Sequence, residues 1–153
     1  MTVRFELPAP WRREIGDHLV VWRRDDWTGR VEVDRLHELP TDRKEWGVRV
    51  LMRNLPPGGD VRQIDLVNSV NHVGWPLTMV STNVLDATRT PVETRITMFY
   101  ELLYFGTTIA AIVDREGVAL WESTLRAPVI EAMLHLEPLF DEGGIANIAD
   151  LWT

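Results

Sequence analysis

Residues 92–106 read VETRITMFYELLYFG, and this stretch decides the fold class. Polar and apolar residues alternate along it, which is the period of a β-strand. The members of one face are Val92, Thr94, Ile96, Met98, Tyr100, Leu102 and Tyr104. The other face starts polar and becomes apolar at Phe99, Leu103 and Phe105. Apolar residues on both faces are typical of a strand at the centre of a helix-covered sheet, so we expect a long central strand here.

Further strands are expected on both sides of this stretch. Gly106 is expected to make the turn into a nearly continuous apolar strand at 107–113, antiparallel to the first. Upstream, alternating or β-rich segments predict strands at residues 3–7, 18–22, 31–36, 61–70 and 77–85. Residues 25–29, DDWTG, predict a hairpin turn between two of these strands.

Two segments have helical features. After Pro40, Thr41 or Asp42 can cap a helix, with Glu45 in capping-box spacing from Asp42. The run PPGG at residues 56–59 ends that helix. Residues 116–140 show helical spacing of apolar side chains, interrupted by Pro128. We therefore expect a kink there, or two helices with Pro128 in the first turn of the second.

The predicted fold class is α+β, with a mostly antiparallel six- or seven-stranded sheet packed with helices. The chain has 153 residues, and we expect residues 1–153 to form a single domain. An alternating βαβα order is missing from the sequence, which disfavours a Rossmann fold or a TIM barrel.

Composition excludes several classes of function. Cysteine is absent, which rules out a disulfide framework, a thiolate zinc site and a cysteine nucleophile. The net charge is −7 and the arginines are scattered, so we expect no nucleic-acid binding. No apolar run is long enough to span a membrane, and residues 1–10 lack the apolar core of a signal peptide. A cytoplasmic location is the expectation, with no membrane partner.

The sequence carries no catalytic motif. Phosphate-binding loops, the G-x-S-x-G motif and H-E-x-x-H are all missing. If the first hairpin pairs Arg24 with Gly29, His18 lies opposite Arg35 and close to His37. A fixed cation between two imidazoles repels a divalent ion, so we disfavour a metal there. We predict no catalytic residue, no cofactor, no metal and no enzymatic activity.

The loop NHVGWP, residues 71–76, and the loop tryptophans are the candidate interaction sites. Indole rings at the rim of a protein are typical of binding hot spots. The candidate partner-binding residues are Trp75, His72, Trp152 and Trp27. Two structural interpretations stay open. The loop can be a turn that Gly74 and Pro76 require, with Trp75 folded onto the core edge, and the other indoles can cap the ends of the sandwich.

The order of these elements resembles the Mog1/PsbP-like sandwich proteins, including the bacterial DcrB (DUF1795-type) branch. The resemblance lies in residues 3–8, VRFELP, followed by Trp11, and in GWP at 74–76 opening a strand. The long strand at 93–105 and the end of the final helix at 136–140 add to it. The tail at 141–153 and the expected kink at Pro128 depart from that pattern. The resemblance implies a non-catalytic, partner-binding domain and carries over no catalytic residue.

Two classes of function follow from these observations. The first is a non-catalytic protein-binding domain, adaptor or chaperone-like, that associates with itself as a homodimer or with another bacterial protein. The second is a small-molecule-binding protein or enzyme that uses the loop from His72 to Trp75. A broad apolar surface favours the first class, and buried polar groups converging on His72 favour the second.

Overall fold

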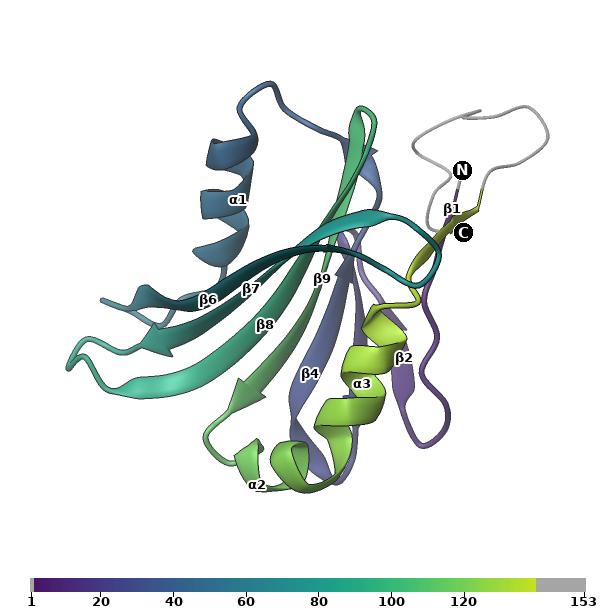
Figure 1. The fold of residues 1–153 in the computed structure, drawn as a ribbon. Coiled ribbons are helices and arrows are strands. Elements are labelled where there is room, and N and C mark those ends of the chain that lie inside the picture. The colour runs from purple at the N-terminus through teal and green to yellow at the C-terminus, as the bar shows by residue number, and fades with distance from the viewer. Residues whose placement is uncertain (1, 140–153) are drawn as a thin grey trace.

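A computed structural model describes the backbone of residues 2–139 (Figure 1). Its main feature is an eight-stranded antiparallel sheet with the strand order β2-β3-β4-β9-β8-β7-β6, in which β5 also pairs with β9. The strands are β2 (Arg12–Ile15), β3 (Leu19–Arg24), β4 (Trp27–Asp34), β5 (His37–Glu38), β6 (Asp60–Val70), β7 (Pro76–Leu85), β8 (Pro91–Leu102) and β9 (Phe105–Asp114). Helix α1 lies on one face of this sheet and α3 on the other (Figure 1). The predicted α+β class is confirmed.

The predicted central strand is β8, which pairs with β7 on one side and β9 on the other. Its residues 95–100 are all buried. Phe99 packs beneath α1 and Tyr100 beneath α3, so both faces are covered as expected. The turn into β9 comes earlier than predicted: Leu102 pairs with Phe105, and Leu103 takes a positive φ of 56°. Gly106 therefore lies inside β9.

Helix α1 (Arg43–Leu51) begins where the sequence predicts. Asp42 is its N-cap and accepts a hydrogen bond from the backbone N–H of Glu45 at 3.0 Å. Trp46 and Val50 face the sheet and form a small apolar cluster with Leu39, Val80 and Phe99. The buried guanidinium of Arg95 donates to the carbonyls of Arg53 and Asn54 just beyond the helix, which fixes this end of α1 on the sheet.

The second helical segment consists of α2 (Val118–Leu120), a π-helical turn η1 (Trp121–Leu125) and α3 (Arg126–Met133). Pro128 lies in the first turn of α3, which confirms the second of the two expected arrangements. The apolar side of this segment covers the larger core cluster, which holds Trp22, Val33, Met98, Ile109, Val129, Met133 and Leu136 among its members. No helix among residues 2–139 has the length and apolar character needed to cross a membrane.

Three sequence expectations are wrong in detail. The last helix ends at Met133 rather than Phe140, because Glu137–Leu139 forms β10, which pairs antiparallel with β1 (Thr2–Arg4). The first hairpin turns at residues 25–26 only, since Arg24 pairs with Trp27 across an irregularity in β3. Trp27 is therefore a strand residue. The large sheet has eight strands instead of six or seven because β2 and β5 were not foreseen.

Candidate functional site

Strand β6 forms one edge of the sheet and carries an apolar surface. The strand is 11 residues long, and nine of its residues are exposed. Exposed apolar side chains follow one another along it and into the next loop: Ile64, Leu66, Val67, Val70 and Val73. We call these five residues the β6 edge surface. A concentration of exposed apolar side chains on one segment of a monomer makes that segment a candidate contact site.

An irregularity divides β6 into two parts. The pairing with β7 shifts between Gln63 and Asp65, so that Ile64 is an extra residue without a partner in β7. From Asp65 to Val70 the pairing is regular, and no charged residue follows Asp65 in this part. The segment from Leu66 to Val70 is therefore a regularly paired, uncharged length of sheet edge.

The loop after β6 is fixed to the end of α3. The buried side chain of Asn71 accepts hydrogen bonds from the backbone N–H groups of Val73 and Trp75, at 3.1 and 2.8 Å. Its amide nitrogen donates to the carbonyl of Leu136 at 2.7 Å. Gly74 adopts a φ of 87°, which a glycine tolerates without steric cost. These bonds make residues 71–75 an ordered platform beside the β6 edge surface.

Tyr100 supports this platform from below. Its ring contacts the indole of Trp75, with ring centroids 5.0 Å apart, and its hydroxyl donates to the carbonyl of Met133 at 2.8 Å. Burial of the phenol raises the pKa of Tyr100 to about 12. The hydroxyl thus stays protonated as a donor and links the sheet to the C-terminal end of α3.

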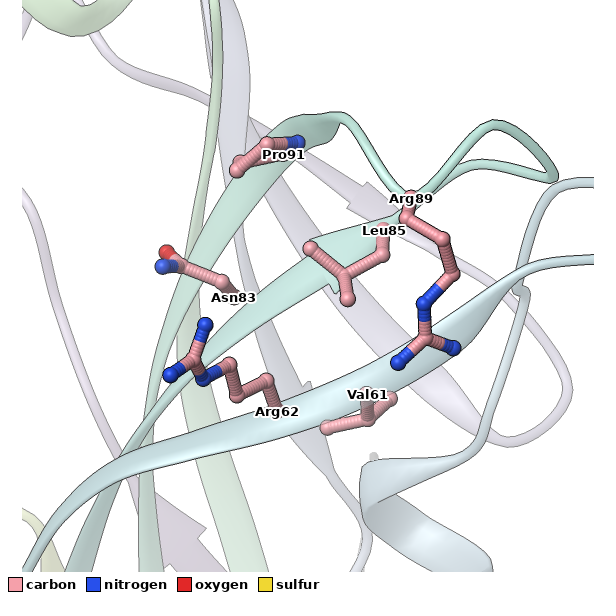
Figure 2. Close-up of a pocket in the computed structure, with 6 residues that line it drawn as sticks. All are labelled: Val61, Arg62, Asn83, Leu85, Arg89 and Pro91. Atoms are coloured by element: carbon pink, nitrogen blue, oxygen red, sulfur yellow. The ribbon is translucent and has the colours of Figure 1, made fainter.

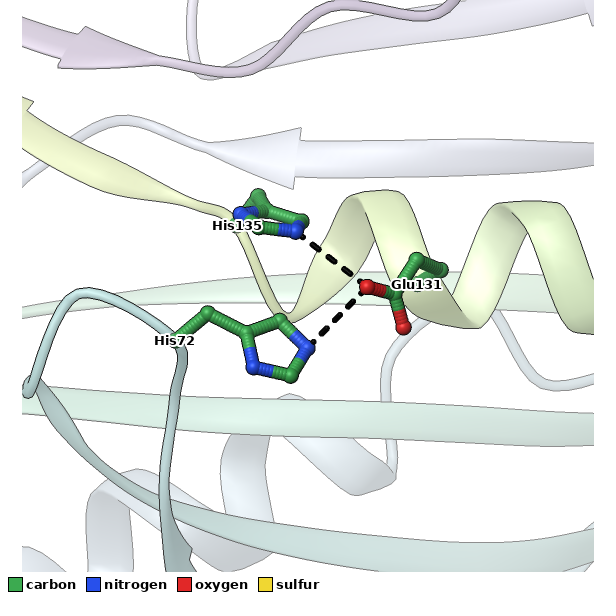
Figure 3. A group of neighbouring side chains, drawn as sticks. All are labelled: His72, Glu131 and His135. Atoms are coloured by element: carbon green, nitrogen blue, oxygen red, sulfur yellow. Dashed lines mark hydrogen bonds and ion pairs between the residues drawn. The ribbon is translucent and has the colours of Figure 1, made fainter.

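His72 projects from this loop towards two side chains at the end of α3, and Figure 3 shows the three together. The Nε2 atoms of His72 and His135 each lie 3.2 Å from the same oxygen, Oε1 of Glu131. The two imidazole rings are 4.5 Å apart between centroids. All three side chains are exposed, so a solvent-borne ligand can reach them.

Open hollows also lie elsewhere on the described sheet, and two of them bear on the sequence predictions. One, of about 470 Å³, is lined by Val61, Arg62, Asn83, Leu85, Arg89 and Pro91 (Figure 2). The Arg89 guanidinium at its rim is paired with Asp60 at 3.1 Å, and the backbone N–H of Val61 together with this guanidinium lowers the pKa of the Asp60 carboxyl. The other, of about 800 Å³, lies between α1 and the sheet.

The hollow beside α1 contains both His18 and His37, with Arg35 on the same wall. The backbone N–H of Arg35 donates to the carbonyl of His18, which confirms the predicted pairing of these two residues. Arg49 and Arg53 also line this hollow. Asp34 lines the same hollow and pairs with Arg53 at 3.2 Å, which leaves two further arginines whose positive charge opposes binding of a cation.

The structure places the predicted partner-binding residues in different environments. Trp75 is 3% exposed and Trp27 is 5% exposed, so neither indole is offered to a partner in this structure. Trp27 stacks on Trp121 and donates from its indole N–H to the carbonyl of Gly117 at 2.9 Å. The expectation that these loop indoles lie at the rim is therefore wrong. His72 is exposed, and its role in partner binding stays a prediction. Trp152 lies outside the described residues.

Sequence reasoning missed two features of this region. The first is the apolar character of the β6 edge, because the alternation at 61–70 predicts a strand but does not tell an edge from an interior position. The second is the convergence of His72 on Glu131 and His135. The spacing of Glu131 and His135 places them one helical turn apart, a signal that was available. The third member comes from a loop 59 residues earlier, which only the fold brings close.

No protein-family model matches the chain, and no curated protein matches it by sequence. Among solved structures, the chain is similar to cyanobacterial PsbP (CyanoP) from Synechocystis, with a TM-score of 0.65. The match covers 90% of this chain and 86% of the cyanobacterial protein at 12% sequence identity. The chain has the Mog1/PsbP-like fold.

A second solved structure supports this assignment of the fold. It is PA94 from Pseudomonas aeruginosa, described as a protein of unknown function and a putative regulator. The TM-score is 0.50 at 12% identity, and the match covers 86% of this chain and 99% of that one. At such low identity the comparison shows a shared fold only, so function has to be argued from the surface of this Mog1/PsbP-like chain itself.

Proposed function

We propose that this protein is a non-catalytic protein-binding domain whose contact surface is the β6 edge surface. The observation that carries the proposal is the concentration of exposed apolar side chains on that edge. Of the eleven large apolar residues that are exposed in the described part of the chain, five lie within residues 64–73. Clustered exposed apolar side chains mark interaction sites, whereas scattered ones carry no such meaning.

The mode of binding that fits this edge is strand addition. A strand at the end of a sheet presents backbone N–H and C=O groups that another strand can pair with. The segment from Asp65 to Val70 pairs regularly with β7 and ends in the hydrogen-bonded loop at residues 71–75. Its backbone is therefore already in the conformation that an added strand requires, and little entropy is lost on pairing.

The occupant we propose is a second copy of this chain, paired antiparallel about Asn68. In that register Leu66 lies opposite Val70 of the second copy, and the same apolar pair occurs again by symmetry. Asn68 lies opposite Asn68 of the second copy, and Asp65 opposite Asn71 of the second copy, so no like charges meet. Apolar cross-strand pairs of this kind stabilise a sheet by roughly 0.2–1 kcal/mol each.

Sedimentation or light scattering tests the proposal directly. Between about 1 and 100 μM the wild-type chain is expected to shift from its 17.6 kDa mass towards twice that value, because self-association follows mass action. Val70→Lys is expected to weaken association at least about tenfold, since an edge lysine opposes strand pairing.

Ile15→Lys on the opposite edge is the matched control. Ile15 is 61% exposed and Val70 is 57% exposed, so the two substitutions change similar surfaces. Association of the Ile15→Lys variant should equal that of the wild type. A 17.6 kDa species at every concentration would overturn self-association, as would equal effects of the two lysines.

Two narrower roles, adaptor and chaperone-like, belong to the same proposal. An adaptor or chaperone-like role, in the cytoplasm and without enzymatic activity, would use the same edge to hold an extended segment of another protein. If the protein has this role, a strand-forming segment of the other protein should compete with self-association. Such a competitor should fail to bind Val70→Lys while still binding Ile15→Lys.

A further inference from the structure

We infer that His72, Glu131 and His135 bind a divalent transition-metal ion, and that Zn²⁺ is the ion that this donor set fits. The inference does not depend on the proposed association, because the three side chains lie on the loop and on the α3 end rather than on the strand. One ligand atom from each residue lies within 4.8 Å of the other two.

The distances match what a tetrahedral zinc ion requires. With zinc-to-ligand bonds of 2.0–2.1 Å, neighbouring ligand atoms in a tetrahedron lie about 3.3 Å apart. The distances from Oε1 of Glu131 to Nε2 of His72 and to Nε2 of His135 are both 3.2 Å. Only the distance between the two imidazole nitrogens needs to adjust, and rotation of these exposed side chains allows that adjustment.

The backbone holds the three residues in place before any ion binds. The N–H of His72 donates to the carbonyl of Leu134 at 3.0 Å, which ties this loop to the end of the helix. The N–H of His135 donates to the carbonyl of Ala132 at 3.0 Å. Glu131 lies in the last turn of α3. A site whose backbone is already fixed loses little entropy on binding.

The electrostatic setting also favours a cation. The site combines one carboxylate with two imidazoles, and it lies at the C-terminal end of a helix, where the helix dipole is negative. Unlike the histidine pair in the hollow beside α1, it has no arginine among its three members. Binding would replace the two contacts between the imidazoles and Oε1 by bonds from all three side chains to one metal ion (Figure 3).

The donor set distinguishes between classes of metal. Two imidazoles and one carboxylate suit zinc and its neighbours among the transition metals, whereas Mg²⁺ and Ca²⁺ require oxygen ligands. Three protein ligands leave the fourth tetrahedral position of Zn²⁺ to water or to a donor from another molecule.

Isothermal titration calorimetry with ZnCl₂ on the untagged full chain tests the inference. We expect one zinc ion per chain, no binding of MgCl₂, and weaker binding as the pH falls because protons compete for the imidazoles. His72→Ala and His135→Ala should each weaken binding at least about tenfold, as loss of supporting groups alone costs this much. The double variant His18→Ala/His37→Ala should bind as the wild type does.

A second readout reports coordination rather than affinity. Co²⁺ in place of Zn²⁺ should produce the visible absorption bands of a tetrahedral ion in the wild type, and Glu131→Gln should weaken them. Val70→Lys should still bind zinc, which separates this test from that of the proposed function. Failure to bind zinc one to one, or zinc binding that His72→Ala and His135→Ala leave unchanged, would overturn the inference.

Discussion

The two edges of the large sheet differ in length, charge and apolar character. Strand β2 at one edge has four residues, three of them charged. Arg12 is paired with Asp25 at 2.6 Å and Glu14 with Arg23 at 3.3 Å. Strand β6 at the other edge has 11 residues and an uncharged half. Short, charged edge strands oppose unwanted pairing, and long apolar ones permit it.

This difference bears on which edge is available for strand addition. Protection of one edge shows that the sequence contains the means to block strand addition where pairing would be harmful. At β6 the charged residues Asp60, Arg62 and Asp65 and the irregularity at Ile64 all lie in the first half, and from Leu66 to Val70 the strand is uncharged and regular. The contrast between a short, charged β2 edge and a long, partly uncharged β6 edge supports the proposal that β6 is the binding edge.

The first prediction concerns the indole beneath the β6 end and has the largest expected effect. Trp75→Ala removes a 3%-exposed side chain that packs on Tyr100, and it should lower the free energy of unfolding by about 3–5 kcal/mol. Urea unfolding followed by circular dichroism measures this.

Val73→Ala in the same loop is the control, since Val73 is 48% exposed and its loss should cost less than about 0.5 kcal/mol. If Trp75→Ala left stability unchanged but reduced association, Trp75 would be a partner contact rather than part of the support beneath the edge.

The second prediction concerns alkaline pH. Burial raises the pKa of Tyr100 to about 12 in the folded chain, above the ordinary value near 10 that applies when it is unfolded. The stability that the neutral phenol contributes is therefore complete below pH 10 and is lost as the pH rises through 12.

Tyr100→Phe removes this pH dependence. Because it also removes the hydrogen bond to the Met133 carbonyl, it should lower the free energy of unfolding by about 1 kcal/mol at neutral pH. Unfolding followed from pH 8 to 12 should therefore show a shallower alkaline decline for Tyr100→Phe than for the wild type. Tyr104→Phe, at a 73%-exposed position, should behave as the wild type. Equal alkaline slopes for all three proteins would show that Tyr100 does not support the β6 side in this way.

Much of the fold could be predicted from local patterns. The alternation at residues 92–106 and the capping residues around Asp42 depend on neighbours in sequence, and both predictions are confirmed apart from the position of one turn. The pairing of β10 with β1 could not be foreseen, because it joins the two ends of the described chain. The residues DDWTG are typical of a turn, yet Trp27 and Gly29 lie in β4, where Gly29 leaves room for the Trp27 indole.

The candidate site was harder to predict because it depends on exposure and distance. Burial of the loop residue Trp75 follows from its contact with Tyr100 on β8. The cluster of His72, Glu131 and His135 depends on the bond between the His72 backbone and the end of α3. Sequence patterns indicate the face on which a residue lies, but not whether another element covers that face.

Hydrogen–deuterium exchange at low and high protein concentration tests the contrast between the two edges most directly. We expect the backbone amides of residues 65–70 to exchange more slowly at about 100 μM than at about 1 μM, because added strands protect them. The amides of Arg12–Ile15 should exchange at the same rate at both concentrations. Protection that appears at β2 instead, or exchange at residues 65–70 that does not depend on concentration, would contradict the account.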